Sequence, residues 1–303
     1  LSLGIKSDPV EYRYSYEWLF ALMRELRIPY LQLGSSFELY LVEDGYITDL
    51  RALAERYGVR IRSCFTAHRE LGGFFTQDAR LETVARRAYE RWIEIGGILG
   101  ADFVGSNPGA VYRDRMGDKP PASTLFLEHL TELMHAAADA GLSGLTIEPM
   151  SSAAEPPSLP DEISTYAEVT AVYHKAHPHD TVPAYFCGDI SHAYVDSAHS
   201  VVHDHWELFE LELPRMAEFH FKNTDELYSS TFGFGPAERE RGIIDLAELR
   251  EILLRRADDV PVEDLTGYLE LGGPKLGRDY SDPLLRDQLV ESIEAIREVF
   301  PEV

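Results

Sequence analysis

The sequence contains little cysteine, few basic side chains and no long apolar run. Its 303 residues include two cysteines, Cys64 and Cys187, which excludes a disulfide framework and a CxxC-type zinc or redox motif. No apolar stretch approaches the roughly 18–20 residues that a membrane-spanning helix needs. The sequence also shows no basic-then-apolar leader. We therefore expect a cytoplasmic protein that does not insert into a membrane.

Basic residues are scarce as well. Lys and Arg number 28 against 52 Asp and Glu, which gives a formal net charge of −24. Proteins bind DNA largely through Lys and Arg side chains that release counterions from phosphates. A surface of the opposite sign repels polyanions, so we expect no nucleic-acid partner; the acidity itself is ordinary for a soluble protein.

Short apolar runs typical of buried strands alternate along the sequence with amphipathic segments typical of helices. The expected strands lie at 3–7, 30–35, 59–65, 101–107, 145–150, 184–192, 216–223 and 267–273. The expected helices lie at 16–27, 47–57, 79–99, 123–140, 159–176, 200–211, 246–256 and 284–300.

Eight alternating units predict an α/β fold in which parallel strands close into a single (β/α)8 TIM barrel. The main alternative is an open, doubly wound sheet. No GxGxxG follows the first expected strand, which favours the barrel. No Pro-, Gly- or Ser-rich linker divides the chain, so we expect one catalytic domain over residues 1–303.

Four expected strands in the second half each end on a side chain that binds metals. These residues are Glu148, Asp189, His220 and Glu270. The carboxyl ends of the strands in a barrel meet at one face, and burying several carboxylates together without a cation is costly. The sequence therefore predicts one divalent metal. An oxygen-rich set suits Mn²⁺, with Mg²⁺ or Co²⁺ as alternatives, better than an ion that prefers thiolates.

This set resembles the metal centre of the xylose-isomerase-like barrel superfamily, and specifically its ketose 3-epimerase branch. Glu148-Pro149 after the fifth strand and Asp189-x-x-His192 after the sixth match the pattern of that branch. The resemblance implies that Glu148 and Glu270 serve both as ligands and as acid/base groups, and that His192 contacts substrate. A carboxylate on each face of a carbon beside a sugar carbonyl could remove and return its proton.

The same superfamily includes an endonuclease that cuts DNA at abasic sites with three zinc ions. That enzyme needs additional histidines. Here the fourth strand ends on Asn107, and the loop after the seventh lacks an Asp-x-His. The sequence therefore favours one metal and a small-molecule substrate.

Whole loop segments are similar to the catalytic alpha subunit of bacterial C-glycoside deglycosidases. The resemblance implies cleavage of a C–C bond in 3-oxo-C-glycosides, by proton abstraction beside the sugar carbonyl and elimination of the aromatic aglycone. It also implies a smaller, β-rich beta subunit and a hetero-oligomer. His68 or a carboxylate of the metal centre would be the base. Six aromatic residues in the segments after strands would together line the barrel mouth, although each one taken alone is more often a residue of loop packing on the rim: Phe65, Phe74, Phe75, Tyr112, Phe232 and Phe234.

Other polar residues expected at the same face could bind sugar hydroxyls or the keto oxygen. They are His192, Asn107, Lys222, Lys275, Gln32 and Lys6. Two other functions stay open. A ketose 3-epimerase or aldose–ketose isomerase would use the same chemistry on a free sugar, and a scaffold protein would use its metal only structurally.

Overall fold

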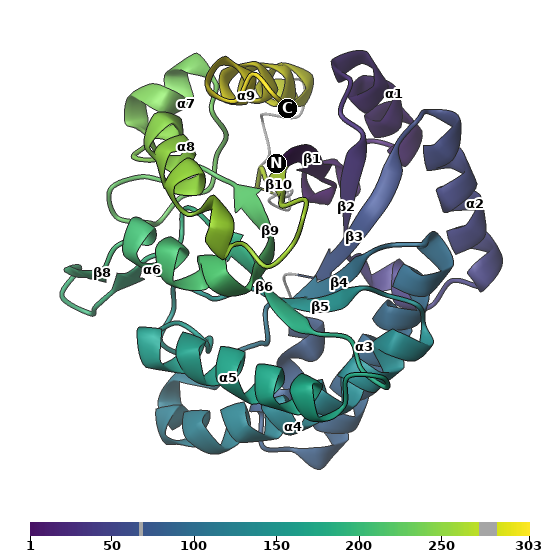
Figure 1. The fold of residues 1–303 in the computed structure, drawn as a ribbon, viewed down its shortest axis with the longest axis vertical. Helices are drawn as coiled ribbons and strands as arrows, with labels where there is room; N and C mark the ends of the chain where they lie inside the picture. The colour runs from purple at the N-terminus through teal and green to yellow at the C-terminus, as the bar shows by residue number, and fades with distance from the viewer. Residues whose placement is uncertain (67–68, 273–283) are drawn as a thin grey trace. The chain divides into compact units, whose positions relative to one another are not determined.

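The structure, a computed structural model, describes residues 1–66, 69–272 and 284–303. Within these ranges, eight parallel strands close into a barrel in the order β1-β10-β9-β6-β5-β4-β3-β2, labelled in Figure 1. This confirms the predicted TIM-barrel class. The strands are β1 (Ser2–Lys6), β2 (Tyr30–Gly34), β3 (Arg60–Thr66), β4 (Phe103–Ser106), β5 (Gly144–Ile147), β6 (Ala184–Asp189), β9 (Met216–Phe221) and β10 (Thr266–Leu269).

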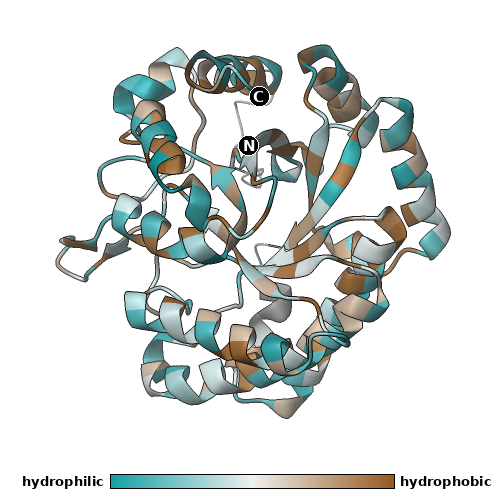
Figure 2. Cartoon of the chain, in the orientation of Figure 1, coloured by the Kyte–Doolittle hydropathy of each residue, from teal (hydrophilic) through white to brown (hydrophobic). Residues whose placement is uncertain are grey.

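Helices follow the strands as the alternating pattern predicts. They are α1 (Tyr16–Leu26), α2 (Asp44–Arg56), α3 (Ala79–Leu99), α4 (Lys119–Asp139), α5 (Pro160–Ala176), α6 (His205–Glu212), α7 (Pro236–Arg241), α8 (Leu246–Arg255) and α9 (Leu285–Val299). Capping residues define the ends of these helices. The side chain of Ser15 caps the start of α1, and Gly100, whose backbone is in the left-handed conformation, ends α3. Figure 2 shows that the helices carry both hydrophobic and hydrophilic residues, as expected when one side of a helix packs inward.

The expected helix at 200–211 begins later than its apolar pattern suggests. Residues Val201–His203 form strand β8, which pairs antiparallel with β7 (Tyr194–Val195). Asp196 closes the connecting turn by accepting hydrogen bonds from the backbone N–H groups of Ala198 and Ser200. Asp204 then caps α6 by accepting from the N–H of Glu207. Helix α6 therefore begins only after the cap.

Close packing divides the chain into two compact units. The first contains residues 1–34, 52–60 and 188–303, and the second contains residues 35–51 and 61–187. The single domain expected over 1–303 stays a prediction. In the first unit β2, β1, β10 and β9 pair in that order. Lys6 lies opposite Gln32, and Tyr268 lies opposite His220, so the carboxyl ends of these strands bring distant residues to one level.

In the second unit β3, β4, β5 and β6 pair in that order, and α4 packs between α3 and α5 (Figure 1). The rings of Phe74 and Phe75 pack on Phe126 of α4, with ring centroids 5.7 and 5.6 Å apart.

The aromatic lining expected at the barrel mouth is wrong for several of its members. Phe65, Phe74, Phe75 and Phe234 are each at most 1 % exposed and Phe232 is 6 % exposed, so these five rings are buried. Large apolar side chains near the strand ends pack into the core, because burial of a phenyl ring stabilises the fold by about 1.5–3 kcal/mol. Tyr112, in contrast, is half exposed.

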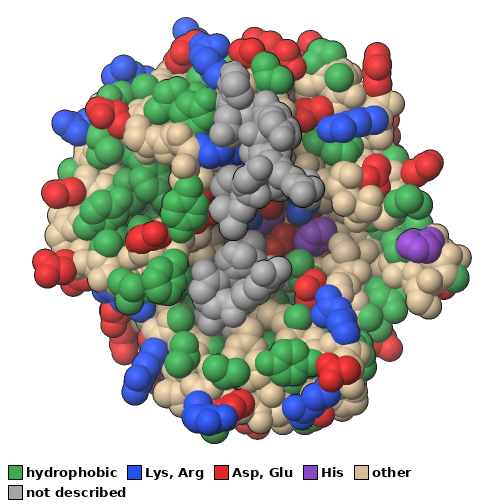
Figure 3. All heavy atoms as spheres, turned by 180° about the vertical axis from the view of Figure 1, so that it is seen from behind, with side chains coloured by type: hydrophobic (Ala, Val, Ile, Leu, Met, Phe, Trp, Pro, Cys, Tyr) green, Lys and Arg blue, Asp and Glu red, His purple; other side chains and the backbone are tan. Residues whose placement is uncertain are grey.

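Acidic and basic side chains are interspersed over the face of the molecule drawn in Figure 3. Several of them pair between helices; Arg86 of α3, for example, lies 2.6 Å from Glu132 of α4. Across the described residues, no helix combines the length and the apolarity that crossing a membrane requires.

Candidate metal centre

Asp189, the last residue of β6, is held by the turn that follows the strand. Its Oδ1 accepts hydrogen bonds from the backbone N–H of Ser191, at 2.8 Å, and from the Ser191 hydroxyl, at 2.7 Å. Its side chain is fully buried. Because Oδ1 is engaged by the turn, Oδ2 is the oxygen directed toward His220 Nδ1, which lies 3.7 Å away.

His220 lies on β9, and its side chain is also fully buried. One ring nitrogen, Nδ1, lies 2.9 Å from Glu270 Oε2. The other, Nε2, lies 2.8 Å from the side-chain oxygen of Gln32 on β2. The imidazole thus has one nitrogen among the carboxylates and the other bound to an amide.

Glu270 follows β10 directly, and its backbone N–H donates to the carbonyl of Phe221. This bond continues the β9–β10 ladder and sets the level of the side chain. Oε1 of Glu270 lies 3.4 Å from the ammonium of Lys6, which lies 3.2 Å from Asp8 Oδ2. Lys6 is fully buried, so its charge is compensated by these two carboxylates.

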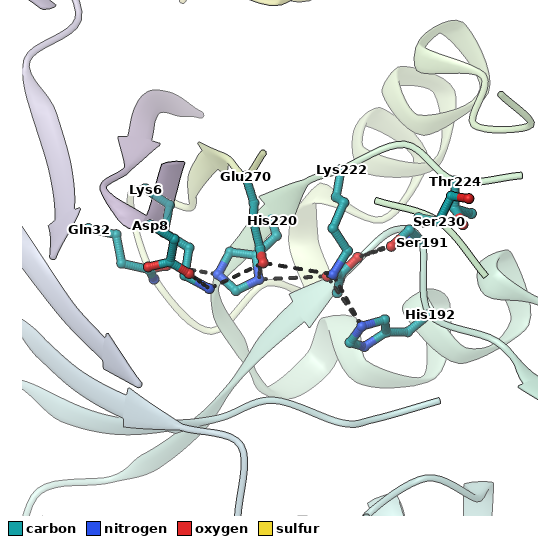
Figure 4. Close-up of polar contacts among 11 residues, drawn as sticks. Lys6, Asp8, Gln32, Ser191, His192, His220, Lys222, Thr224, Ser230 and Glu270 are labelled. Atoms are coloured by element: carbon teal, nitrogen blue, oxygen red, sulfur yellow. Dashed lines mark hydrogen bonds and ion pairs between the residues drawn. The ribbon is translucent and has the colours of Figure 1, made fainter. Parts of the chain in front are cut away.

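A second ammonium approaches the same group from Lys222, the residue after β9. Lys222 Nζ forms an ion pair with Asp189 Oδ2 and lies 4.0 Å from Glu270 Oε1. It also lies 3.3 Å from His192 Nε2, and His192 Nε2 lies 3.4 Å from Asp189 Oδ2. Figure 4 shows Lys222, His192 and Glu270 pointing toward one another. Two lysines and a histidine therefore surround two carboxylates of the site.

These neighbours control the charge of the carboxylates. Burial raises the pKa of Asp189, but the charges of His192 and Lys222 and the contact with His220 outweigh it and hold that pKa well below its usual range. Burial likewise raises the pKa of Glu270, and the charges of Lys222, Lys6 and His220 outweigh it in the same direction. Both carboxylates are ionised at neutral pH.

The residues fit a divalent cation. Asp189 Oδ2 and Glu270 Oε2 are buried oxygens that both face His220 Nδ1. One ligand atom from each of Glu148, Asp189, His220 and Glu270 lies within 4.8 Å of the others. Three carboxylates and an imidazole are donors suited to a hard or borderline divalent ion. This buried group could therefore bind a divalent metal, as the sequence predicts, whereas Mn²⁺ in particular stays a prediction.

The structure brings several of the residues predicted to bind substrate to this group. His192 and Lys222 lie beside Asp189, and Gln32 contacts His220. Asn107 follows β4 in the second unit, half-buried, and its backbone N–H donates to Thr66. His68 and Lys275 lie outside the described residues. The catalytic and substrate-binding roles of all these residues stay predictions.

Two residues of the site were missed from the sequence. Ser191 orients Asp189, and the signal for it is the Asp-x-Ser spacing of a turn in which a carboxylate accepts from the residue two positions later. Asp8 pairs with Lys6, and a lysine at the end of a buried strand is itself a signal that a carboxylate lies nearby.

The loop after β9 is organised by one carboxylate. Asp225 accepts hydrogen bonds from the N–H groups of Leu227 and Ser229 and from the hydroxyls of Ser229 and Ser230. The Ser229 N–H and the Ser230 hydroxyl are the main causes that lower the pKa of Asp225 to about 2. The hydroxyl of Thr224 donates to the Ser230 carbonyl, which ties the loop to the residues beside Lys222.

We expect this loop to lose order in acid. An unfolded Asp titrates near pH 4, at about 3.9, and Asp225 near 2 in the folded protein. Its stabilising contribution is therefore complete above about pH 4 and lost as the pH falls through about 2. An NMR titration of the Asp225 carboxyl carbon measures this directly. An Asp225 that titrates near pH 4 in the folded protein would contradict the network.

Comparison with known proteins identifies the family. Residues 25–262 match the family model described as xylose isomerase-like TIM barrel. The comparison with curated proteins gives no match.

Solved structures share the fold over nearly the whole chain. A putative xylose isomerase from Rhodospirillum rubrum matches with a TM-score of 0.80 and 18 % identity, over 98 % of this chain and 99 % of the other. D-psicose 3-epimerase from Clostridium cellulolyticum matches with 0.70 and 17 %, over 99 % of both chains. The 3-keto-D-glucoside 4-epimerase from E. coli matches with 0.62 and 14 %, over 96 % and 98 %. At these identities the likeness shows the fold, and the family match rests on the sequence: the chain belongs to the xylose isomerase-like TIM barrel family.

Proposed function

We propose that this protein is a sugar isomerase or epimerase that uses a divalent metal to abstract a proton beside a sugar carbonyl. The observation that carries the proposal is the buried group of Glu148, Asp189, His220 and Glu270. Burying three carboxylates has a high desolvation cost, and a fold that only needed stability would fill the same volume with apolar residues at lower cost.

The ionised state of Glu270 suits a general base. Lys6 and Lys222 keep the carboxylate charged without protonating it, because an ammonium titrates far above neutral pH. When bound, a divalent ion would stabilise the negative charge that develops on the substrate's oxygens as the proton leaves. Lys222 and His192 lie beside Asp189 and are placed to donate hydrogen bonds to a sugar hydroxyl or carbonyl.

The substrate class that we propose is a ketose or a 3-keto-glucoside. The fold neighbours include an epimerase named for D-psicose and one named for 3-keto-D-glucoside, and both names describe a sugar with a carbonyl beside a carbon that carries a proton. Epimerisation and isomerisation share the abstraction step and differ in where the proton returns.

Cleavage of a 3-oxo-C-glycoside is the second candidate. It begins with the same proton abstraction and then eliminates the aromatic aglycone instead of returning the proton. The burial of Phe65, Phe74, Phe75 and Phe234 removes one argument for an aromatic substrate. The beta subunit and the hetero-oligomer stay predictions tied to this candidate.

Product analysis tests the proposal. The purified chain, supplied with Mn²⁺, is incubated with D-psicose, D-fructose, D-xylose, a 3-keto-glucoside and a 3-oxo-C-glucoside, and the products are separated by chromatography. We expect an epimer or an aldose–ketose pair from at least one free sugar or 3-keto-glucoside. Release of aglycone without sugar interconversion would move the assignment to the deglycosidase, and no product from any of them would contradict both.

A further inference from the structure

We infer that Gln32 is a positioning residue for the metal centre: its amide oxygen holds the proton of His220 on Nε2, so that Nδ1 presents an unprotonated lone pair to the metal. The inference rests on the proposed metal-dependent function and assigns Gln32 a role different from the substrate contact expected from the sequence.

The contact joins strands that are not neighbours. Gln32 lies on β2 and His220 on β9, and β1 and β10 pair between them. Both side chains are 0 % exposed, and Gln32 Oε1 lies 2.8 Å from His220 Nε2. Figure 4 shows Gln32 on one side of the imidazole and Glu270 on the other.

The chemistry of the two groups sets the tautomer. An amide oxygen can only accept a hydrogen bond, so the nitrogen that it contacts must carry the proton. A neutral imidazole has one N–H, which leaves Nδ1 as the nitrogen with a lone pair. Nδ1 faces the carboxylate oxygens Glu270 Oε2 at 2.9 Å and Asp189 Oδ2 at 3.7 Å. These carboxylates favour a proton on Nδ1 in the metal-free protein, and a divalent ion bound among them would displace that proton and leave the one on Nε2.

Burial makes the contact consequential. An imidazole that ligates a metal is generally oriented by an acceptor on its other nitrogen, and loss of that acceptor typically weakens metal binding by about 10–100-fold. In water another acceptor would replace it. At this fully buried position, loss of the Gln32 oxygen removes the acceptor that lies 2.8 Å from Nε2 and with it the preference for one tautomer.

The experiment measures Mn²⁺ affinity in the whole chain, by electron paramagnetic resonance of the free ion. In Gln32→Met, a side chain of similar length lacks the strong acceptor, whereas Gln32→Glu keeps an acceptor at the same place. We expect Mn²⁺ to bind about 10–100-fold more weakly to Gln32→Met and to bind Gln32→Glu at least as tightly as the wild type. Thermal unfolding in the presence of a chelator checks that each variant is folded.

A folded Gln32→Met with wild-type Mn²⁺ affinity would overturn the inference; a change in KM alone would instead assign Gln32 to the substrate. A second readout needs no variant at position 32. Long-range ¹H–¹⁵N spectra of the wild type loaded with diamagnetic Mg²⁺, with His220→Asn for assignment, report which nitrogen carries the proton. We expect Nε2–H, and Nδ1–H would overturn the inference. A wild type that binds neither Mn²⁺ nor Mg²⁺ but still carries a proton on Nε2 would contradict the proposed function and leave the contact with Gln32 standing.

Discussion

Replacement of Glu270 by glutamine is expected to lower turnover of the sugar substrate by about 10⁴-fold, the upper end of the range for loss of a general base. The amide cannot accept the proton, and it also removes one negative charge from the buried group that holds the metal. The shape of the side chain is kept, so the protein is expected to stay folded. Steady-state kinetics at saturating Mn²⁺, with metal content measured in the same sample, gives the result.

Glu298→Gln is the matched control. Glu298 makes an exposed ion pair of 3.4 Å with Arg239, far along the chain from any strand end, and exposed pairs contribute about 0–1 kcal/mol to stability. Its substitution is expected to leave turnover unchanged. A Glu270→Gln protein that holds metal and turns over like the control would remove Glu270 from the chemistry.

Replacement of Lys6 by methionine is expected to lower the free energy of unfolding by about 3–5 kcal/mol, because removal of one partner from a buried pair leaves uncompensated charge. Here two carboxylates, Asp8 and Glu270, would lose the ammonium between them. Urea unfolding of the metal-free protein at neutral pH measures the change without a bound cation to offset it.

Two further variants isolate the charge effect. Lys175→Met, at an exposed position on α5, is expected to change stability by no more than about 0.5 kcal/mol. Adding Asp8→Asn to Lys6→Met removes one of the two uncompensated charges and is expected to recover part of the loss, a coupling that a double-mutant cycle measures. If Lys6→Met unfolds like Lys175→Met, the ammonium does not stabilise the site.

Much of the fold could be predicted because periodicity acts locally. The helix expected at 79–99 has those bounds in the structure, since its apolar stripe and Gly100 define both the segment and its end. The start predicted for the helix at 200–211 was wrong because a turn residue, Asp196, and a capping residue, Asp204, determine that boundary. The spacing of apolar residues contains no information about these polar side chains.

The same distinction between local pattern and three-dimensional contact applies to the candidate site. Glu148, Asp189, His220 and Glu270 could be predicted because parallel strands carry their last residues to a common edge. The contacts that set the charge and orientation of these ligands could not be predicted, because they depend on which side chains reach across intervening strands. Gln32 was expected to bind substrate, yet its amide lies against His220.

The aromatic residues show a related limit. Loops after barrel strands were expected to present their phenyl rings to a substrate, and all five of those rings are buried instead. Sequence position places a residue near the mouth of the barrel, but three-dimensional packing decides whether its side chain turns inward. The charge around Glu270 is likewise a property of contacts, since Lys6 lies at the end of β1 and Lys222 directly after β9.

Deuterium exchange tests the central claim most directly. The sugar that the enzyme converts is incubated in D₂O with the metal-free protein and with the same protein supplied with Mn²⁺, and mass spectrometry with ¹H NMR locates the label. Proton abstraction by a metal-dependent base predicts one deuterium at the carbon beside the carbonyl, only with metal and with a rate that falls in Glu270→Gln. Conversion without label at that carbon, or equal exchange without metal, would contradict the account.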